Sequence, residues 1–153
     1  MTTGMSSTVA SSKIAVPERF ALPAGRAFSE EFTRLRERAL DWIHAYYDVD
    51  HLRRAGDWLL ALAPDAAEPL VIAALTHDME RTVPGGPLLD KANTPWDDPV
   101  YNTAHCKRSA AVVATWLTLQ GASEPFVRAV QQPIVEHEFG GSPEGDLMQA
   151  ADS

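Results

Sequence analysis

The stretch Ala73-Ala74-Leu75-Thr76-His77-Asp78-Met79-Glu80-Arg81 decides how the rest of the chain is interpreted. In it, an apolar run leads directly into an adjacent imidazole and carboxylate, those of His77 and Asp78. Both side chains need polar partners inside a buried helix, so the pair is a poor core element by itself. A divalent metal ion satisfies lone pairs on both groups at once. The stretch therefore predicts a metal site at its C-terminal end.

The composition predicts one globular domain. Of the 153 residues, 45% are hydrophobic and 22% are charged, as in ordinary soluble proteins, and the length suffices for one core but not for two. We expect residues 1–27 to form a disordered tail with an irregular lead-in, and residues 28–153 to form the domain. The net charge of −8 argues against binding to a nucleic-acid backbone, since that needs clustered Lys and Arg.

The compartment is predicted from what the sequence lacks. The single cysteine, Cys106, cannot form an internal disulfide, and the N-terminus has no signal-peptide pattern. No apolar run approaches the roughly 20 residues that a membrane span needs. We expect a cytoplasmic protein that binds neither membranes nor nucleic acids.

Apolar residues at helical spacing predict an all-α helical bundle. Ser29 is expected to cap the first helix and Asp48 the second, while Gly121 closes the fourth. Pro133 predicts a kink or a break in the fifth helix. The expected helices are 29–47, 48–63, 67–81, 100–120, 123–139 and 143–153. Trp42, Trp58 and Trp116 are interpreted as core residues.

The segment 83–99 is rich in proline and glycine and is predicted to be a long loop. Loops of this length inside a compact domain are usually functional or mobile. Trp96 and Tyr101 flank the loop, and either side chain could close over a substrate.

Five of the expected helices carry one or two residues of metal-ligand type, and a bundle can point all of them at one spot. These residues are His51, His77, Asp78, His105, His137 and Asp152. They are too many for one ion, so we predict two ions bridged by Asp78. We assign His51, His77 and Asp152 to one ion, and His105 and His137 to the other. Such ligands suit Fe, Mn, Zn, Co or Ni, and the open positions could hold a water or hydroxide nucleophile.

The same order of residues resembles the HD-domain superfamily in its six-ligand, two-metal form. The resemblance covers about residues 50–153 and includes the local contexts Asp50-His51-Leu52-Arg53-Arg54, Ile134-Val135-Glu136-His137-Glu138 and Leu147-Met148-Gln149-Ala150-Ala151-Asp152. It implies a helical core with the ions at its middle. Most such proteins are similar to metal-dependent phosphohydrolases, and a minority of the two-metal form are iron oxygenases that cleave C–C or C–P bonds.

This sequence departs from the family pattern in two places. Many members carry His-Asp-x-Gly-Lys, where this chain has Glu80 and Arg81. Arg81 keeps a cation that can hold a phosphate bidentately. The family normally continues with more helix after the last ligand, so the resemblance also predicts residues beyond Ser153.

Other polar residues have a functional and an ordinary interpretation. Arg81, Lys107 and Arg108 could bind an anionic small-molecule substrate, or they could be surface charges. Glu138 could orient the His137 ring from outside the ligand set. His44 is interpreted as a packing residue of the first helix. Cys106 is expected to point away from His105 as a buried, inert thiol.

The leading hypothesis is a metal-dependent phosphohydrolase for a small phosphate ester, with Asp78 and Arg81 as its catalytic residues. A di-iron oxygenase of the same fold is the first alternative, and a non-catalytic ligand-binding module stabilised by metal is the second. The sequence does not identify the substrate or the oligomeric state.

Overall fold

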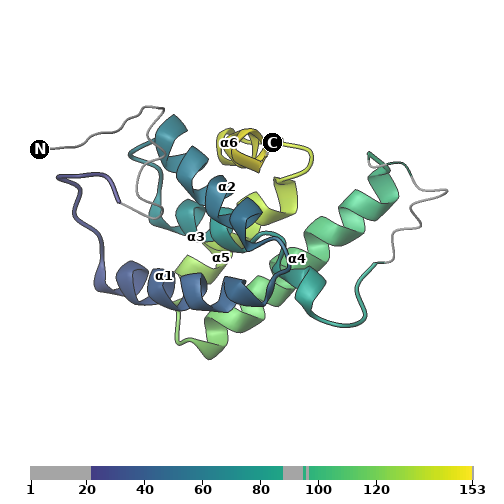
Figure 1. Ribbon diagram of the computed structural model, residues 1–153, viewed down its shortest axis with the longest axis horizontal. Coiled ribbons are helices and arrows are strands. Elements are labelled where there is room, and N and C mark those ends of the chain that lie inside the picture. The colour runs from purple at the N-terminus through teal and green to yellow at the C-terminus, as the bar shows by residue number, and fades with distance from the viewer. Residues whose placement is uncertain (1–21, 88–94, 96, 153) are drawn as a thin grey trace, which may run out of the picture.

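Helices form all the regular structure in the part of the chain that the computed structural model describes, which is residues 22–87, 95 and 97–152. The all-α prediction is therefore confirmed. Six α-helices and two short 3-10 helices follow one another (Figure 1). They are α1 (Glu30–Trp42), η2 (Ile43–Ala45), α2 (Val49–Leu62), α3 (Glu68–Thr76), η3 (Met79–Thr82), α4 (Pro99–Leu119), α5 (Glu124–Glu136) and α6 (Pro143–Asp152).

Helix α3 is the centre of the bundle, in contact with α1, α2, α5 and α6 (Figure 1). Every residue from Leu70 to Thr76 is buried. A helix that is apolar on all sides is stable only when other elements cover all its sides. Each fully buried Leu, Ile or Val side chain contributes about 1.5–3 kcal/mol to this packing. The helix that leads into His77 is thereby fixed in the core.

Capping side chains set the starts of the first two helices, as the sequence predicted. The Ser29 hydroxyl accepts a hydrogen bond from the backbone N–H of Phe32, and it donates one to Glu68 at the start of α3. The Asp48 carboxylate accepts a hydrogen bond from the backbone N–H of His51 at 3.2 Å. This cap holds His51 in the first turn of α2.

Helix α6 approaches α5 closely at Gly145. A Cβ atom at that position would lie 2.7 Å from the Cβ of Glu136, so only glycine allows the two helices to come this near. Helix α6 also packs on α2. These contacts place Asp152, the last residue of α6, beside the ends of α3 and α5.

One helix prediction was wrong, and one alternative of another is excluded. The third helix was expected to run past Arg81, but α3 ends at Thr76 and a turn separates it from η3. Of the kink or break predicted at Pro133, the break is absent, since α5 continues through this buried residue.

One of the three tryptophans assigned to the core was also placed wrongly. The rings of Trp42 and Trp116 stack at 4.4 Å and join α1 to α4. The Trp58 side chain lies on the outer face of α2 and is 57% exposed, since Leu52, Ala55 and Leu59 form the inner face of that helix.

Candidate metal centre

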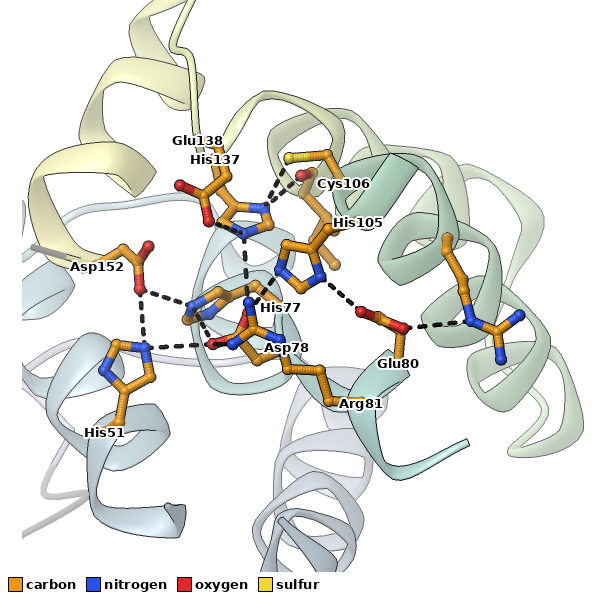
Figure 2. Close-up of polar contacts among 12 residues, drawn as sticks. His51, His77, Asp78, Glu80, Arg81, His105, Cys106, His137, Glu138 and Asp152 are labelled. Carbon is orange, nitrogen blue, oxygen red and sulfur yellow. Dashed lines mark hydrogen bonds and ion pairs between the residues drawn. The ribbon is translucent and has the colours of Figure 1, made fainter. Parts of the chain in front are cut away.

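The six residues assigned to metal by the sequence lie together in the structure (Figure 2). Each comes from a helix end or a helix face that points into the bundle. His51 is on α2, His77 and Asp78 follow α3, His105 is on α4, His137 follows α5, and Asp152 ends α6. The side chains of His77, His105 and His137 are fully buried.

The end of α3 explains how neighbours in the sequence both reach this cluster. Successive side chains on an α-helix point about 100° apart, so a continuous helix would turn one of the pair away. His77 instead ends the helix, and Asp78 adopts φ −105° and ψ 6°. This lies in the sparsely allowed bridge region of backbone conformation, where many active-site residues are found.

The first group of potential ligands contains His51, His77, Asp78 and Asp152. One oxygen of Asp152, Oδ1, lies 2.9 Å from Nε2 of His51 and 2.8 Å from Nε2 of His77. Oδ2 of Asp78 lies 3.3 Å and 3.5 Å from the same two nitrogen atoms. One ligand atom from each of the four residues lies within 4.8 Å of the others.

The second group contains Asp78, His105 and His137. Oδ1 of Asp78 lies 2.9 Å from Nε2 of His105 and 3.9 Å from Nε2 of His137. The two oxygen atoms of Asp78 thus face different groups, Oδ2 the first and Oδ1 the second. That Asp78 bridges two ions stays a prediction.

Glu138 lies on the cluster side of His137, contrary to the interpretation that it orients the ring from outside. Its Oε2 is 3.5 Å from Nε2 of His137, the nitrogen that faces the other ligands, and the carboxylate forms a third possible group with His137 and Asp152. Glu138 is therefore an additional carboxylate within reach of a cation here.

In two imidazoles, the hydrogen bond of Nδ1, the nitrogen that faces away from the cluster, determines which ring nitrogen carries the proton. Nδ1 of His77 donates to the carbonyl of Ala74 at 2.8 Å, and Nδ1 of His137 donates to that of Ile134 at 2.7 Å. A carbonyl only accepts, so in each neutral ring the lone pair is on Nε2. Those lone pairs face carboxylate oxygens, which are also acceptors. Only a proton or a metal cation between them relieves this conflict.

The electrostatics of the cluster favour positive charge at the same places. Hydrogen bonds to Asp152 and Asp78 raise the pKa of His51 to about 10. Burial acts to lower the pKa of His105, but hydrogen bonds to Asp78 and Glu80 outweigh it and raise that pKa to about 9. The pKa of Asp78 is lowered in spite of its burial, because His77 and His105 stabilise the carboxylate.

His137 gives the clearest sign that the cluster fits a metal ion. Its Nε2 is buried and makes no hydrogen bond to any residue in the described part of the chain, while carboxylate oxygens of Glu138 and Asp78 lie 3.5 Å and 3.9 Å away. Buried polar atoms without a partner are rare in folded proteins and call for an explanation such as an ion or a water. With imidazole nitrogens and carboxylate oxygens as donors, the cluster suits a transition-metal ion.

Arg81 is the cation nearest to the cluster among the three assigned to substrate binding. Its Nη1 is 3.5 Å from Oδ2 of Asp78 and donates to the hydroxyl of Tyr46 at 3.2 Å. The side chain is 32% exposed, so its remaining N–H groups can meet a solute. Lys107 is exposed on α4.

Arg108 is held by the protein itself. Its Nε donates to Glu80 at 3.2 Å, and its Nη2 donates to the carbonyls of Val83 and Pro84 at 3.0 Å and 2.8 Å. We therefore do not include Arg108 in the proposed substrate-binding set.

Two residues beside the cluster were not recognised from the sequence. Glu80 is buried and accepts a hydrogen bond from Nδ1 of His105 at 2.7 Å. Cys106 does not point away from the cluster as expected, since its Sγ lies 3.7 Å from Nδ1 of His137. One feature of the sequence could have drawn attention to Glu80: it is a charged residue three positions after His77, where the family pattern has glycine. Cys106 had no such signal.

Three further aromatic or imidazole residues were interpreted from the sequence. His44 is not a packing residue, because it lies exposed on η2, where its Nε2 is 3.3 Å from Nη2 of Arg53. The ring of Tyr101 lies nearly parallel to that of His105, 6.2 Å away. Trp96 and residues 88–94 of the long loop lie outside the described residues.

Comparisons with known protein families, with curated proteins and with solved structures found no match. In the described part of the chain, no helix combines the length and the apolar character that crossing a bilayer requires.

Proposed function

We propose that this protein is an HD-type, metal-dependent phosphohydrolase that acts on a small, anionic phosphate ester. The observation that carries the proposal is the position of Asp78, whose two oxygen atoms face two separate groups of imidazoles. A carboxylate shared in this way is what a pair of neighbouring ions needs. His51, His77 and Asp152 would hold one ion with Asp78, while His105 and His137 would hold the other.

Two bound divalent ions would supply a water deprotonated at neutral pH and would offset the charge that develops on the phosphate. The chain's own residues provide the rest. Arg81, next to Asp78 and partly exposed, would bind a phosphate oxygen through its free N–H groups. Its bond to Tyr46 would keep the guanidinium oriented while substrate binds.

The test is phosphate release from a panel of small phosphoesters by the purified protein supplied with Mn²⁺, Co²⁺ or Fe²⁺. The wild type should turn over at least one compound, and Asp78→Ala should abolish that turnover. Full activity in Asp78→Ala would contradict the proposal. A wild type that gains thermal stability from metal but turns over nothing would instead support the non-catalytic module.

A di-iron oxygenase is the second candidate, and the composition of the second group favours it. Asp78, His105 and His137 are two imidazoles and one carboxylate, the ligand set typical of non-haem Fe(II) oxygenases. Metal content separates the two functions. Iron together with substrate-dependent oxygen uptake would support the oxygenase, whereas zinc or manganese without oxygen uptake would support the hydrolase.

A further inference from the structure

Glu80 places a buried carboxylate directly behind one of the potential metal ligands. Its Oε1 accepts a hydrogen bond from Nδ1 of His105 at 2.7 Å, and the Glu80 side chain is only 2% exposed (Figure 2). On the opposite side of the same ring, Nε2 of His105 lies 2.9 Å from Oδ1 of Asp78. The imidazole is thus held between one carboxylate outside the cluster and one inside it.

This arrangement differs from that of the other two buried imidazoles. His77 and His137 use their Nδ1 atoms to reach carbonyls of their own helices, which are neutral acceptors. A carboxylate partner on the outer nitrogen makes an imidazole more basic and fixes its tautomer and its orientation. Of these three buried imidazoles, His105 is therefore the one whose affinity for a metal ion should depend on another residue's side chain.

Arg108 fixes Glu80 in turn. Its Nε donates to Oε2 of Glu80, and its Nη2 donates to the carbonyls of Val83 and Pro84. The backbone of Gly86 lies close to the same pair, because a Cβ there would come within 2.6 Å of Oε2 of Glu80. The carboxylate thus has one arrangement, with one oxygen for His105 and the other for Arg108.

We propose that Glu80, oriented by Arg108, is a positioning residue for the second group of ligands, Asp78, His105 and His137. This inference rests on the proposed metal centre. Glu80 keeps the proton of His105 on Nδ1 and so presents Nε2 to the cation. It has no contact of this kind with the first group, so its removal should weaken one ion and spare the other.

The competing explanation is that Glu80 only anchors the segment after η3 through Arg108. In that case its loss would lower the melting temperature and leave both metal affinities unchanged. Glu68→Gln is the matched control, because Glu68 also accepts two hydrogen bonds, from the N–H and the hydroxyl of Ser29, but lies at the start of α3 away from the cluster.

The experiment is a metal titration of the full chain with Zn²⁺ or Mn²⁺, with bound metal measured after dialysis. Glu68→Gln should bind two ions, each with the same affinity as in the wild type. Glu80→Ala should bind the first ion as wild type does and the second about 10–100-fold more weakly. Glu80→Gln should show a smaller loss, since its amide oxygen can still accept from His105, and it covers the case in which Glu80→Ala fails to fold.

A second readout is the tautomer of His105 in the zinc-loaded protein, from the two-bond ¹⁵N–¹H couplings of the imidazole. In the wild type His105 should keep the Nδ1–H form, and in Glu80→Ala the Nδ1–H signal of His105 should be lost while those of His77 and His137 stay.

The outcomes separate this inference from the proposed function. Wild-type affinity for the second ion in both Glu80 variants would overturn the inference. A wild type that binds fewer than two ions would overturn both it and the two-ion centre. A wild type that binds two ions, depends on Glu80 for the second, and hydrolyses no phosphoester would refute the hydrolase alone.

Discussion

Replacing Asp78 by asparagine should remove the metal dependence of stability, because this is the residue that the two ligand groups share. Its Oδ2 lies 3.3 Å from His51 and 3.5 Å from His77, and its Oδ1 lies 2.9 Å from His105. Asn has the same shape, but it carries no charge and offers only one oxygen. Both groups therefore lose their common anionic ligand in one substitution.

The size of the effect follows from binding linkage. An ion present at 100 times its dissociation constant stabilises the folded state by about 2.7 kcal/mol, so two ions contribute about 5.4 kcal/mol. For a domain of this size, each kcal/mol raises the melting temperature by about 2–4 °C. The wild type should therefore melt about 10–20 °C higher with metal than with a chelator. In Asp78→Asn the difference should fall to about 5 °C or less.

The assay is thermal denaturation followed by circular dichroism, with excess chelator or with saturating Mn²⁺ or Zn²⁺. Asp65→Asn is a suitable control, because Asp65 is an exposed aspartate in the turn between α2 and α3. It should keep the full wild-type shift. If Asp78→Asn gained as many degrees from metal as the wild type does, Asp78 would not be a shared ligand and the two-ion arrangement would be wrong.

Three further predictions concern pH, substrate and packing. In the metal-free protein the pKa of His51 is raised to about 10 and that of His105 to about 9, whereas the unfolded value is near 6.5. Protonation of these two rings therefore stabilises the folded state fully below pH 6.5, and this stabilisation is lost as the pH rises through 9–10. Melting temperatures measured in chelator should fall over that range, and a flat or rising profile would contradict the assignment. Arg81→Gln should raise KM for a phosphoester about tenfold or more in steady-state kinetics while two ions stay bound, and an unchanged KM would exclude Arg81 from substrate binding. Gly145→Ala should lower the free energy of unfolding, measured by urea denaturation, by about 1–3 kcal/mol, because the added Cβ would press on the side chain of Glu136. An unchanged free energy of unfolding would mean that α6 can shift to make room.

The cluster of potential ligands could be predicted from the sequence because the order of its six residues resembles that of one family, and because some of the positions also carry a local signal. An imidazole or carboxylate at the end of an apolar helical stripe is unfavourable in a core without a partner. Residues such as His77 and His137 can therefore be recognised from the sequence as candidates for a polar or metal site. The helix count follows from apolar periodicity in the same way. What the sequence predicted was therefore the residues that point inward, together with the helices that carry them.

The residues that support the ligands could not be found in this way. Glutamate is usually a surface residue, so nothing in the sequence indicated that Glu80 is buried. Its burial depends on the turn after Thr76, which the apolar periodicity did not indicate. Cys106 fits an apolar helix face equally well beside the cluster or away from it. The position of Glu80 is set by how α4 packs next to η3, and that of Cys106 by how α4 packs against the end of α5. Both are tertiary contacts with no local signal. The prediction that Trp58 lies in the core was wrong for a similar reason, since helical spacing does not tell which face of α2 the bundle covers.

The backbone contributes to the cluster as well as the side chains. His77 ends α3 and His137 ends α5, and each donates its Nδ1 proton to the carbonyl three residues earlier. That carbonyl belongs to the last turn, where regular helical partners run out, and at Ile134 the imidazole adds to a hydrogen bond from the backbone N–H of His137 at 3.3 Å. Each of these imidazole bonds turns Nε2 toward the cluster. Asp152 ends α6 at the same place. Three helices thus direct their C-terminal ends, which carry partial negative charge, at one point. The fold itself therefore favours positive charge at this point, in addition to the charge of the carboxylates.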